Sequence, residues 1–210
     1  MMKIIAHRGY FDKDIKENTY RALCRGINSK DLEGIEFDIH LTKDKKLVII
    51  HDYFINRTSN GQGMVEKMTL EELRKYNYGS KKNIQTIATL DKILDIKTKK
   101  MLLIEIKCYR NAKIMAKIIK EYLPKDRNNI YFISFNERVL NYLKNNYKVG
   151  YISIKKMKTK GNIIVANKLF YKKYNGIKKL FLYTIKSKQE LNYGDIYYIC
   201  DNVSLIFNSS

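Results

Sequence analysis

Short apolar runs rich in β-branched residues alternate along this chain with segments of helical periodicity. Such runs predict strands, and they cover residues 3–6, 34–41, 47–50, 101–106, 130–135, 149–152, 163–166, 180–185 and 196–200. Apolar residues at helical spacing fill several of the gaps, at residues 19–27, 69–76, 89–96, 112–123 and 137–143. Thr69, followed by Glu72 three residues later, predicts a capping box at the start of the second helix.

The alternation of strands and helices predicts a parallel sheet. Nine strand candidates within 210 residues favour a closed barrel, so the expected α/β fold is a single compact TIM-type (β/α)8 barrel with a short C-terminal end. We expect it to form one domain over residues 1–210. The barrel has eight strands and the sequence offers nine candidates, so one candidate is surplus. The surplus run is expected to be 149–152 or 163–166, because the link at 155–160 is too short for a good helix.

The link between the runs at 34–41 and 47–50 is irregular, because a parallel crossover normally takes about a dozen residues. One interpretation is a hairpin around Asp44 and Lys45, in which Asp38 lies opposite His51. In the other, the chain doubles back outside the barrel and two parallel strands end side by side. Both arrangements bring Asp38 and His51 together.

Composition indicates a chain that is globular throughout, since 45% of its residues are apolar and it holds one proline. Its 41 basic and 21 acidic residues give a net charge of +20, which suits an anionic partner. Lysines are scattered over almost every segment, however, and this favours a compositional bias over a dedicated polyanion-binding face. We expect no specific nucleic-acid partner and at most a weak association with an anionic membrane surface.

The cysteines and the hydropathy pattern favour a cytoplasmic protein. Cys24, Cys108 and Cys200 are widely spaced and odd in number, which is typical of reduced thiols and not of a disulfide frame or a zinc site. No apolar run approaches the roughly 18 residues of a membrane-spanning helix. The apolar stretch at residues 1–6 is also too short for a secretion signal.

Four short polar strings follow or end apolar runs, and they are His7-Arg8-Gly9, Glu36-Phe37-Asp38, His51-Asp52 and Glu105-Ile106-Lys107. Side chains two residues apart in a strand share a face, so Glu36 and Asp38 point the same way. Two buried carboxylates on one face repel each other unless a cation lies between them. With Glu105 they form an all-oxygen set that suits one divalent cation, Mg²⁺ or Ca²⁺. Apolar neighbours disfavour the alternative, carboxylates paired with lysines on a solvated face.

The histidines and cations of these strings suit phosphodiester cleavage. His7 and His51 follow runs that end at the C-terminal rim of the expected barrel, where active sites lie in this architecture. Two imidazoles can take a proton from a nucleophile and give one to a leaving oxygen. Arg8 and Lys107 supply positive charge for a phosphate.

Two further side chains lie close to these strings in the sequence. Asp52 is expected to orient a neighbouring side chain. His40 shares a strand face with Glu36 and Asp38, and it either belongs to the site or lies at the rim.

The pattern resembles a known family, the glycerophosphodiester phosphodiesterases of the phospholipase C-like barrel superfamily. Residues 3–136 follow the family's order of motifs throughout. The matching strings are Ala6-His7-Arg8-Gly9, Glu17-Asn18-Thr19, Glu36-Phe37-Asp38-Ile39-His40-Leu41-Thr42-Lys43-Asp44, His51-Asp52, Asn56-Arg57-Thr58-Ser59-Asn60-Gly61-Gln62-Gly63, Thr69-Leu70-Glu71-Glu72-Leu73, Thr89-Leu90, Glu105-Ile106-Lys107 and Ser134-Phe135.

The resemblance implies the same roles that the residues suggest by themselves. It implies an acid/base pair, a metal site and a phosphate clamp, formed respectively by His7 and His51, by Glu36, Asp38 and Glu105, and by Arg8 and Lys107. It also implies secondary places for Asn18 and Tyr183. The implied substrate is a small-molecule phosphodiester, a deacylated phospholipid headgroup that is split to glycerol 3-phosphate and an alcohol.

The C-terminal third departs from the family pattern. Tyr183-Thr184 stands where the family has Trp-Thr, and Cys200-Asp201-Asn202-Val203 stands where it has Thr-Asp-x-Pro. Ala88 and Lys16 replace prolines, and Asn56 replaces an aspartate. None of these changes removes an acid, a base or a metal ligand. Tyr183 does alter the expected pocket wall, and with it the substrate range.

Other functions fit parts of the pattern. A phosphodiesterase of the same fold that acts on a lysophospholipid or a teichoic-acid-like polymer would make use of the basic surface. A non-catalytic phosphate-binding module would keep the site only to bind, which the intact set of acids and histidines disfavours. Nucleic-acid binding rests on charge alone.

Overall fold

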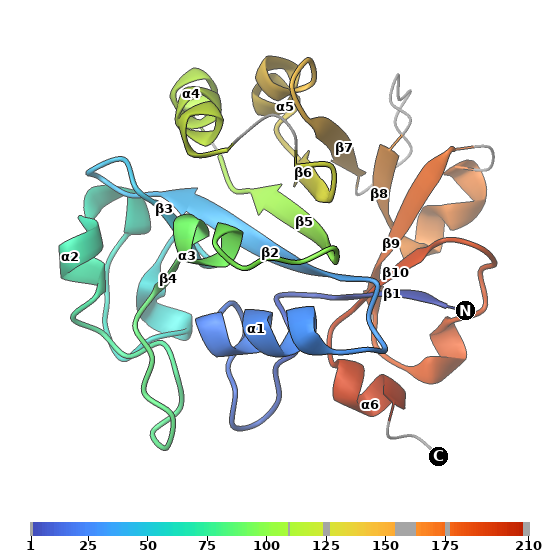
Figure 1. Ribbon diagram of the computed structural model, residues 1–210, viewed down its shortest axis with the longest axis horizontal. Coiled ribbons are helices and arrows are strands. Elements are labelled where there is room, and N and C mark those ends of the chain that lie inside the picture. Colours follow the sequence, from blue (N-terminus) through green and yellow to red (C-terminus); the bar gives the residue numbers. More distant parts are fainter. Residues whose placement is uncertain (1, 109, 124–126, 154–162, 175–176, 208–210) are drawn as a thin grey trace.

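The computed structural model describes residues 2–108, 110–123, 127–153, 163–174 and 177–207. Within them eight parallel strands close into a barrel, and these are β1 (Lys3–Ala6), β2 (Gly34–Leu41), β5 (Met101–Ile106), β6 (Ile130–Ser134), β7 (Lys148–Ser153), β8 (Ile163–Asn167), β9 (Lys179–Ile185) and β10 (Tyr197–Cys200). The first strand pairs with the last and also with β2, which closes the ring (Figure 1). The predicted TIM-type barrel is confirmed.

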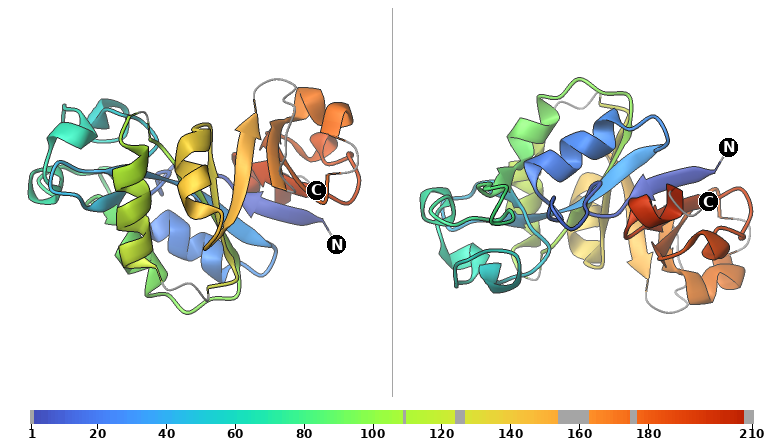
Figure 2. Two further views of the ribbon diagram at one scale, coloured as in Figure 1. Left: turned by 90° about the horizontal axis from the view of Figure 1, so that it is seen from above. Right: turned by 90° about the horizontal axis from the view of Figure 1, so that it is seen from below.

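Helices cover the outside of the barrel, and they are α1 (Tyr20–Asn28), α2 (Leu70–Leu73), α3 (Leu90–Leu94), α4 (Ala112–Tyr122), α5 (Glu137–Leu143) and α6 (Val203–Phe207). All but α6 overlap a predicted helix. Thr69 and Glu72 form the predicted capping box, although the helix that follows ends early, at Leu73. Figure 2 shows α4 and α5 side by side on the outer surface.

Short 3₁₀ turns replace helices in several connections. They are η1 (Ile55–Arg57), η2 (Val65–Lys67), η3 (Lys168–Tyr174) and η4 (Lys188–Glu190). The links from β8 to β9 and from β9 to β10 use η3 and η4, which keeps the C-terminal part of the barrel short, as the sequence predicts.

Of the nine predicted strand runs, the one that stays outside the barrel is 47–50, which forms β3 (Leu47–Ile49); this corrects the expectation that the surplus run is 149–152 or 163–166. Those two runs are the barrel strands β7 and β8, and the link at 155–160 lies outside the described residues. β3 is antiparallel to β2, and β4 (Ala88–Thr89) is antiparallel to β3, so neither can join a parallel ring. They lie with α2 in an excursion, residues 42–89, beside the C-terminal end of β2 (Figure 1).

The hairpin between β2 and β3 differs from the predicted register by one residue. Ile39 pairs with Ile49, so Asp38 lies opposite Ile50 and not opposite His51. The physical reason is a longer turn, in which Lys45 takes a left-handed conformation with φ of 63°. His51 is carried one residue beyond Asp38 and still reaches the barrel rim.

Side chains alternate between two buried layers. Ile5, Leu103 and Phe181 fill the interior of the barrel, while Phe37 and Leu140 pack between strands and helices. Because Phe37 points outward, Glu36 and Asp38 point into the barrel.

The cysteines are free thiols and Cys200 is buried. None of the helices in the described part of the chain combines the length and the apolar character needed to cross a membrane.

Candidate active site

Three buried carboxylates meet at the C-terminal end of the barrel. Glu36 and Asp38 lie on one face of β2, and Asp38 pairs in register with Glu105 of β5. One carboxylate oxygen from each of these three residues lies within 4.8 Å of the corresponding oxygens of the other two. Burial and the charge of Asp38 raise the pKa of Glu36 to about 8 and that of Glu105 to about 7. Such a crowded set of hard oxygen donors fits a divalent cation such as Mg²⁺ or Ca²⁺.

Lys107 and Asn18 hold Asp38 in its ionised form. Lys107 Nζ lies 3.1 Å from Asp38 Oδ1 and 2.6 Å from Glu105 Oε1, and Asn18 Nδ2 donates to Asp38 Oδ2 at 2.8 Å. Burial alone would raise the pKa of Asp38, but the charges of Lys107 and His51 outweigh it and lower that pKa. Burial likewise opposes the ionised form of Lys107, yet Asp38 and Glu105 raise its pKa, so the ammonium stays charged.

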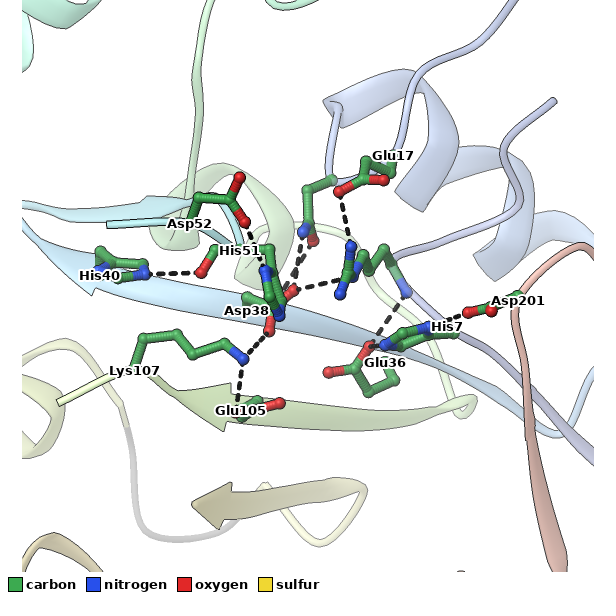
Figure 3. Close-up of polar contacts among 12 residues, drawn as sticks. His7, Glu17, Glu36, Asp38, His40, His51, Asp52, Glu105, Lys107 and Asp201 are labelled. Carbon is green, nitrogen blue, oxygen red and sulfur yellow. Dashed lines mark hydrogen bonds and ion pairs between the residues drawn. The ribbon is translucent and has the colours of Figure 1, made fainter. Parts of the chain in front are cut away.

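His7, just after β1, is held by a partner from the far end of the chain. Its Nδ1 donates to Asp201 Oδ1 at 2.5 Å, and its Nε2 lies 3.7 Å from Glu36 Oε2. Burial lowers the pKa of His7, but Glu36 and Asp201 outweigh it and leave the pKa above its ordinary value. Asp201 directly follows β10, which pairs with β1, so closure of the barrel creates this contact (Figure 3).

The turn after β1 aims Arg8 into the site. Arg8 and Gly9 both have positive φ, 56° and 82°. A Cβ on Gly9 would lie 2.8 Å from the carbonyl carbon of Ala22, so glycine is required there. The backbone N–H of Arg8 donates to Glu36 Oε2 at 3.0 Å, and its guanidinium donates to Glu17 Oε1 at 2.8 Å. The guanidinium is thereby fixed beside the carboxylates.

His51 reaches the same place from the excursion. Its Nδ1 donates to Asp52 Oδ1 at 2.6 Å, and Arg57 Nε donates to Asp52 Oδ2, also at 2.6 Å. Burial lowers the pKa of His51, and the hydrogen bond from Arg57 lowers that of Asp52 to about 2. Arg57 also donates to Glu17 Oε1 at 2.7 Å. Since Glu17 accepts from Arg8 as well, a chain of ion pairs joins the two histidine-bearing loops.

His40 contacts the backbone of the excursion and is not one of the three clustered carboxylates' polar partners in the described part of the chain. It is fully buried, and its Nε2 donates to the carbonyl oxygen of His51 at 3.1 Å. Its ring meets that of Tyr53 edge to face, with centroids 4.9 Å apart. Burial lowers the pKa of His40 to about 4, so the ring is neutral. Figure 3 shows it beside the His51 backbone, to which it is hydrogen-bonded.

Six of these polar side chains line one cavity of about 180 Å³ that also has an apolar wall. The polar side is formed by His7, Arg8, Glu36, His51, Glu105 and Lys107. The opposite side is formed mainly by Ile133, Phe135, Ile152, Val165, Tyr183 and Ile199. The hydroxyl of Tyr183 donates to the carbonyl oxygen of Ser153 at 3.3 Å, so this ring stands in the wall where the family pattern has tryptophan.

Asp201, Glu17 and Arg57 belong to the site network, and sequence reasoning missed all three as site residues. Asp201 carried a signal, because it directly follows an apolar strand run just as His7 does. The contact between Arg57 and Glu17 spans 40 residues, and no local pattern marks it.

Comparison with known proteins shows where this arrangement recurs. The model of the glycerophosphoryl diester phosphodiesterase family matches residues 7–166. The glycerophosphodiester phosphodiesterase of Caldanaerobacter subterraneus subsp. tengcongensis is 36% identical over 152 residues, covering 67% of this chain and 61% of the relative. That of Bacillus altitudinis is 37% identical over 139 residues, covering 60% and 56%. The chain thus spans about three fifths of the length of these curated relatives.

A solved structure supports the same fold. A phosphodiesterase of Oleispira antarctica, in complex with the product sn-glycerol-3-phosphate, matches with a TM-score of 0.84 over 97% of this chain and 94% of its own, at 23% identity. That likeness establishes the barrel fold. The family model covers most of the sequence, and its range includes the site residues between His7 and Lys107. The chain therefore belongs to the glycerophosphoryl diester phosphodiesterase family.

Proposed function

We propose that this chain, as one catalytic domain, hydrolyses glycerophosphodiesters to glycerol 3-phosphate and an alcohol. One observation carries the proposal: two of the carboxylates, both histidines and both cations named above line a single cavity at the C-terminal rim of the barrel, and an oxygen of the third carboxylate, Asp38, lies within 4.8 Å of oxygens of the other two. Active sites of this architecture lie at that rim. The relatives named as glycerophosphodiester phosphodiesterases support the same reaction class.

Glu36, Asp38 and Glu105 would hold one divalent cation, Mg²⁺ or Ca²⁺. The fit rests on three buried carboxylates whose oxygens converge within 4.8 Å, a donor set that hard cations prefer. A cation bound there would act as a Lewis acid on a phosphate oxygen. Asn18 and Lys107 keep Asp38 ionised and oriented for that role.

Arg8 and Lys107 would bind the phosphate, since both line the cavity and both stay charged. His7 and His51 each bind an aspartate through Nδ1, which leaves Nε2 available for proton transfer. One would take the proton of the attacking oxygen. The other would protonate the oxygen of the departing alcohol as its bond to phosphorus breaks, so that one water is consumed for each P–O bond cleaved.

An assay of the purified protein with glycerophosphocholine tests this proposal. Release of glycerol 3-phosphate is expected with Mg²⁺ or Ca²⁺, and it should be abolished by EDTA and by His7→Ala. Glu71→Gln, on an exposed glutamate of α2, is the matched control and should retain full activity. Absence of release with any glycerophosphodiester, or activity that survives both EDTA and His7→Ala, would overturn the proposal.

A lysophospholipid is a second candidate substrate, and the apolar wall of the cavity favours it. Phe135 extends that wall to the rim, where half of its surface is exposed. Activity on lysophospholipid in anionic vesicles, compared with glycerophosphocholine over a salt series, discriminates the two. A higher kcat/KM on vesicles that falls steeply with salt would favour the lipid, because salt screens attraction to the surface. Weak membrane association and a cytoplasmic location stay predictions.

A further inference from the structure

A larger cavity, of about 810 Å³, lies at the opposite end of the barrel. Met101, Lys179 and Tyr197 line it, and they are the first residues of β5, β9 and β10. The candidate active site lies at the other ends of these strands. Hydrolysis at the C-terminal rim therefore gives no reason for the chemistry of this basal pocket.

The basal pocket is lined by cations with little counter-charge. The charged side chains among its described lining residues are Lys97, Lys99, Arg127, Lys179 and Glu33. Like charges in one concavity repel each other, and a concave surface of one sign focuses its potential on an ion of the opposite sign. Lys97 and Lys99 are exposed, so their charges are available to a ligand.

Two tyrosine rings hold further ammonium groups in place without neutralising them. Lys179 Nζ lies 4.4 Å from the centroid of the Tyr131 ring and 4.8 Å from that of Tyr197. Lys148 Nζ lies 5.0 Å from the Tyr131 ring, and Lys3 Nζ lies 5.3 Å from the Tyr197 ring. A ring quadrupole attracts an ammonium but leaves its net charge intact. Fixing these groups in advance reduces the entropy lost when a ligand binds.

The polar contacts of the basic side chains determine how much of the positive charge of the pocket is neutralised. Lys179 donates to the hydroxyl of Tyr131 at 2.7 Å, and Arg127 donates to the carbonyl oxygen of Leu94 at 2.9 Å. Both acceptors are neutral. Lys3 does pair with a carboxylate, that of the exposed Asp195, at 2.8 Å. Among the described residues that line the pocket, Glu33 is the one acidic side chain, and Asp195 pairs with Lys3 beside it.

The volume of the pocket and the existing contacts of its two tyrosine rings favour one class of ligand. Both tyrosine rings already contact ammonium groups, and Tyr197 also stacks on Phe181 with centroids 4.6 Å apart. Stacking of a nucleobase is disfavoured for that reason. The pocket volume, about 810 Å³, accommodates a small molecule. A small ligand with several negative charges suits both this volume and the cations that line it.

We propose that the basal pocket, defined by Lys97, Lys99, Arg127, Tyr131, Lys179 and Tyr197, binds a compact polyanion with two or more linked phosphate groups. Lys97 and Lys99 at the edge and Lys179 on the floor would contact separate phosphates. This binding site is independent of the proposed hydrolysis, because no residue of the pocket belongs to the catalytic cavity.

Calorimetric titration with pyrophosphate tests the proposal, in EDTA and at about 0.15 M salt so that distant charges are screened. The double variant Lys97→Gln/Lys99→Gln should weaken binding about tenfold, which is what two exposed charge contacts contribute. The matched control, Lys43→Gln/Lys75→Gln, removes two exposed lysines of the excursion and gives the same net charge. It should bind within about twofold of the unchanged protein.

Lys179→Gln is a second, single-charge variant on the floor of the pocket and should also weaken binding. Pyrophosphate should raise the Tm of the unchanged protein, and orthophosphate at equal ionic strength should raise it less. Absence of pyrophosphate binding, or equal weakening by both double variants, would overturn the proposal. An affinity for pyrophosphate that is unchanged in Lys97→Gln/Lys99→Gln would also overturn it, because the ligand would then bind elsewhere. Retention on phosphatidylglycerol vesicles that depends on these lysines, without pyrophosphate binding, would overturn it in favour of a membrane surface.

Discussion

The two histidine–aspartate pairs of the candidate site are alike in geometry and unlike in origin. His7 and Asp201 are 194 residues apart and meet because β1 pairs with β10. His51 and Asp52 are neighbours in the chain, on the excursion outside the barrel. In both pairs Nδ1 donates to the aspartate, at 2.5 Å and 2.6 Å. The same contact is thus reached once by closure of the barrel and once by adjacent residues.

The pairs differ in what surrounds the aspartate. Arg57 binds Asp52 through two nitrogens, so much of the charge of that carboxylate is already balanced. Among the described residues, Asp201 forms an ion pair only with His7. The pKa of His7 is raised against the effect of burial, first by the charge of Glu36 and then by the hydrogen bond to Asp201, while burial lowers the pKa of His51. A pair built from adjacent residues relies on a third partner for its orientation, whereas the barrel itself holds the long-range pair.

The largest effect is expected from Glu36→Gln, because the carboxylate cluster lies between the two pairs and is common to both. Activity should fall by about 10²- to 10³-fold or more, since charge stabilisation of the reacting phosphate is lost. Mg²⁺ or Ca²⁺ should raise the Tm of the unchanged protein but not that of the variant. The metal-free Tm should not fall, because a buried carboxylate is removed. Glu71→Gln is the control; a variant that is still stabilised by the cation would contradict the metal site.

Next come His7→Ala and His51→Ala, each of which should lower kcat by about 10²-fold with a much smaller change in KM. Both losses should be partly rescued by added imidazole, which a merely structural role would not allow. Circular dichroism checks that both variants fold. A large loss at one histidine and none at the other would break the equivalence of the two pairs.

A smaller effect, and a difference between the pairs, is expected from the aspartates. Asp201→Asn should lower kcat by about 10- to 100-fold, whereas Asp52→Asn should cost less than about tenfold, because Arg57 already offsets the Asp52 charge. The kcat of both variants is measured over a pH series. If kcat fell equally in the two variants, or fell further in Asp52→Asn, the contribution of each aspartate to kcat would not depend on the charges around it.

The smallest effect concerns stability. The pKa of Asp52 is lowered to about 2 in the folded protein, against an unfolded value of about 3.9. A lowered folded pKa stabilises the protein above the unfolded pKa, and the contribution is lost as the pH falls towards about 2. Asp52 is only half-buried, so screening keeps its contribution below about 1 kcal/mol. Urea unfolding of the unchanged protein and Asp52→Asn should differ at a pH of about 6 and converge near a pH of about 2; a constant difference would rule out the ion pair as its cause.

Sequence pattern was sufficient to predict the barrel and the gathering of the polar strings. Parallel strands end on one face of a barrel, so residues after apolar runs, such as His7 and Lys107, are brought together without any knowledge of side-chain contacts. Strand parity places Glu36 and Asp38 on one side by the same local rule. These inferences succeed because they depend on periodicity within a few residues.

Two features of the fold were not predictable in this way. The apolar run at 47–50 looks like any barrel strand, and its exclusion follows from hydrogen bonding to β2 in the antiparallel sense. The register of that hairpin depends on Lys45, a residue that adopts positive φ without the glycine or asparagine that would mark it. The hairpin register that sets Asp38 directly opposite His51 was wrong for this reason, although His51 still lies close enough to act on the charge of Asp38.

By itself the sequence determined which polar residues gather at one end of the barrel, because that follows from local periodicity. Only the tertiary structure decided their partners. Asp201 meets His7 through the final strand that closes the ring, and Arg57 meets Glu17 across 40 residues of chain. Such contacts depend on how segments far apart in the sequence pack together. The number of residues between two side chains does not indicate how close they lie in the folded protein.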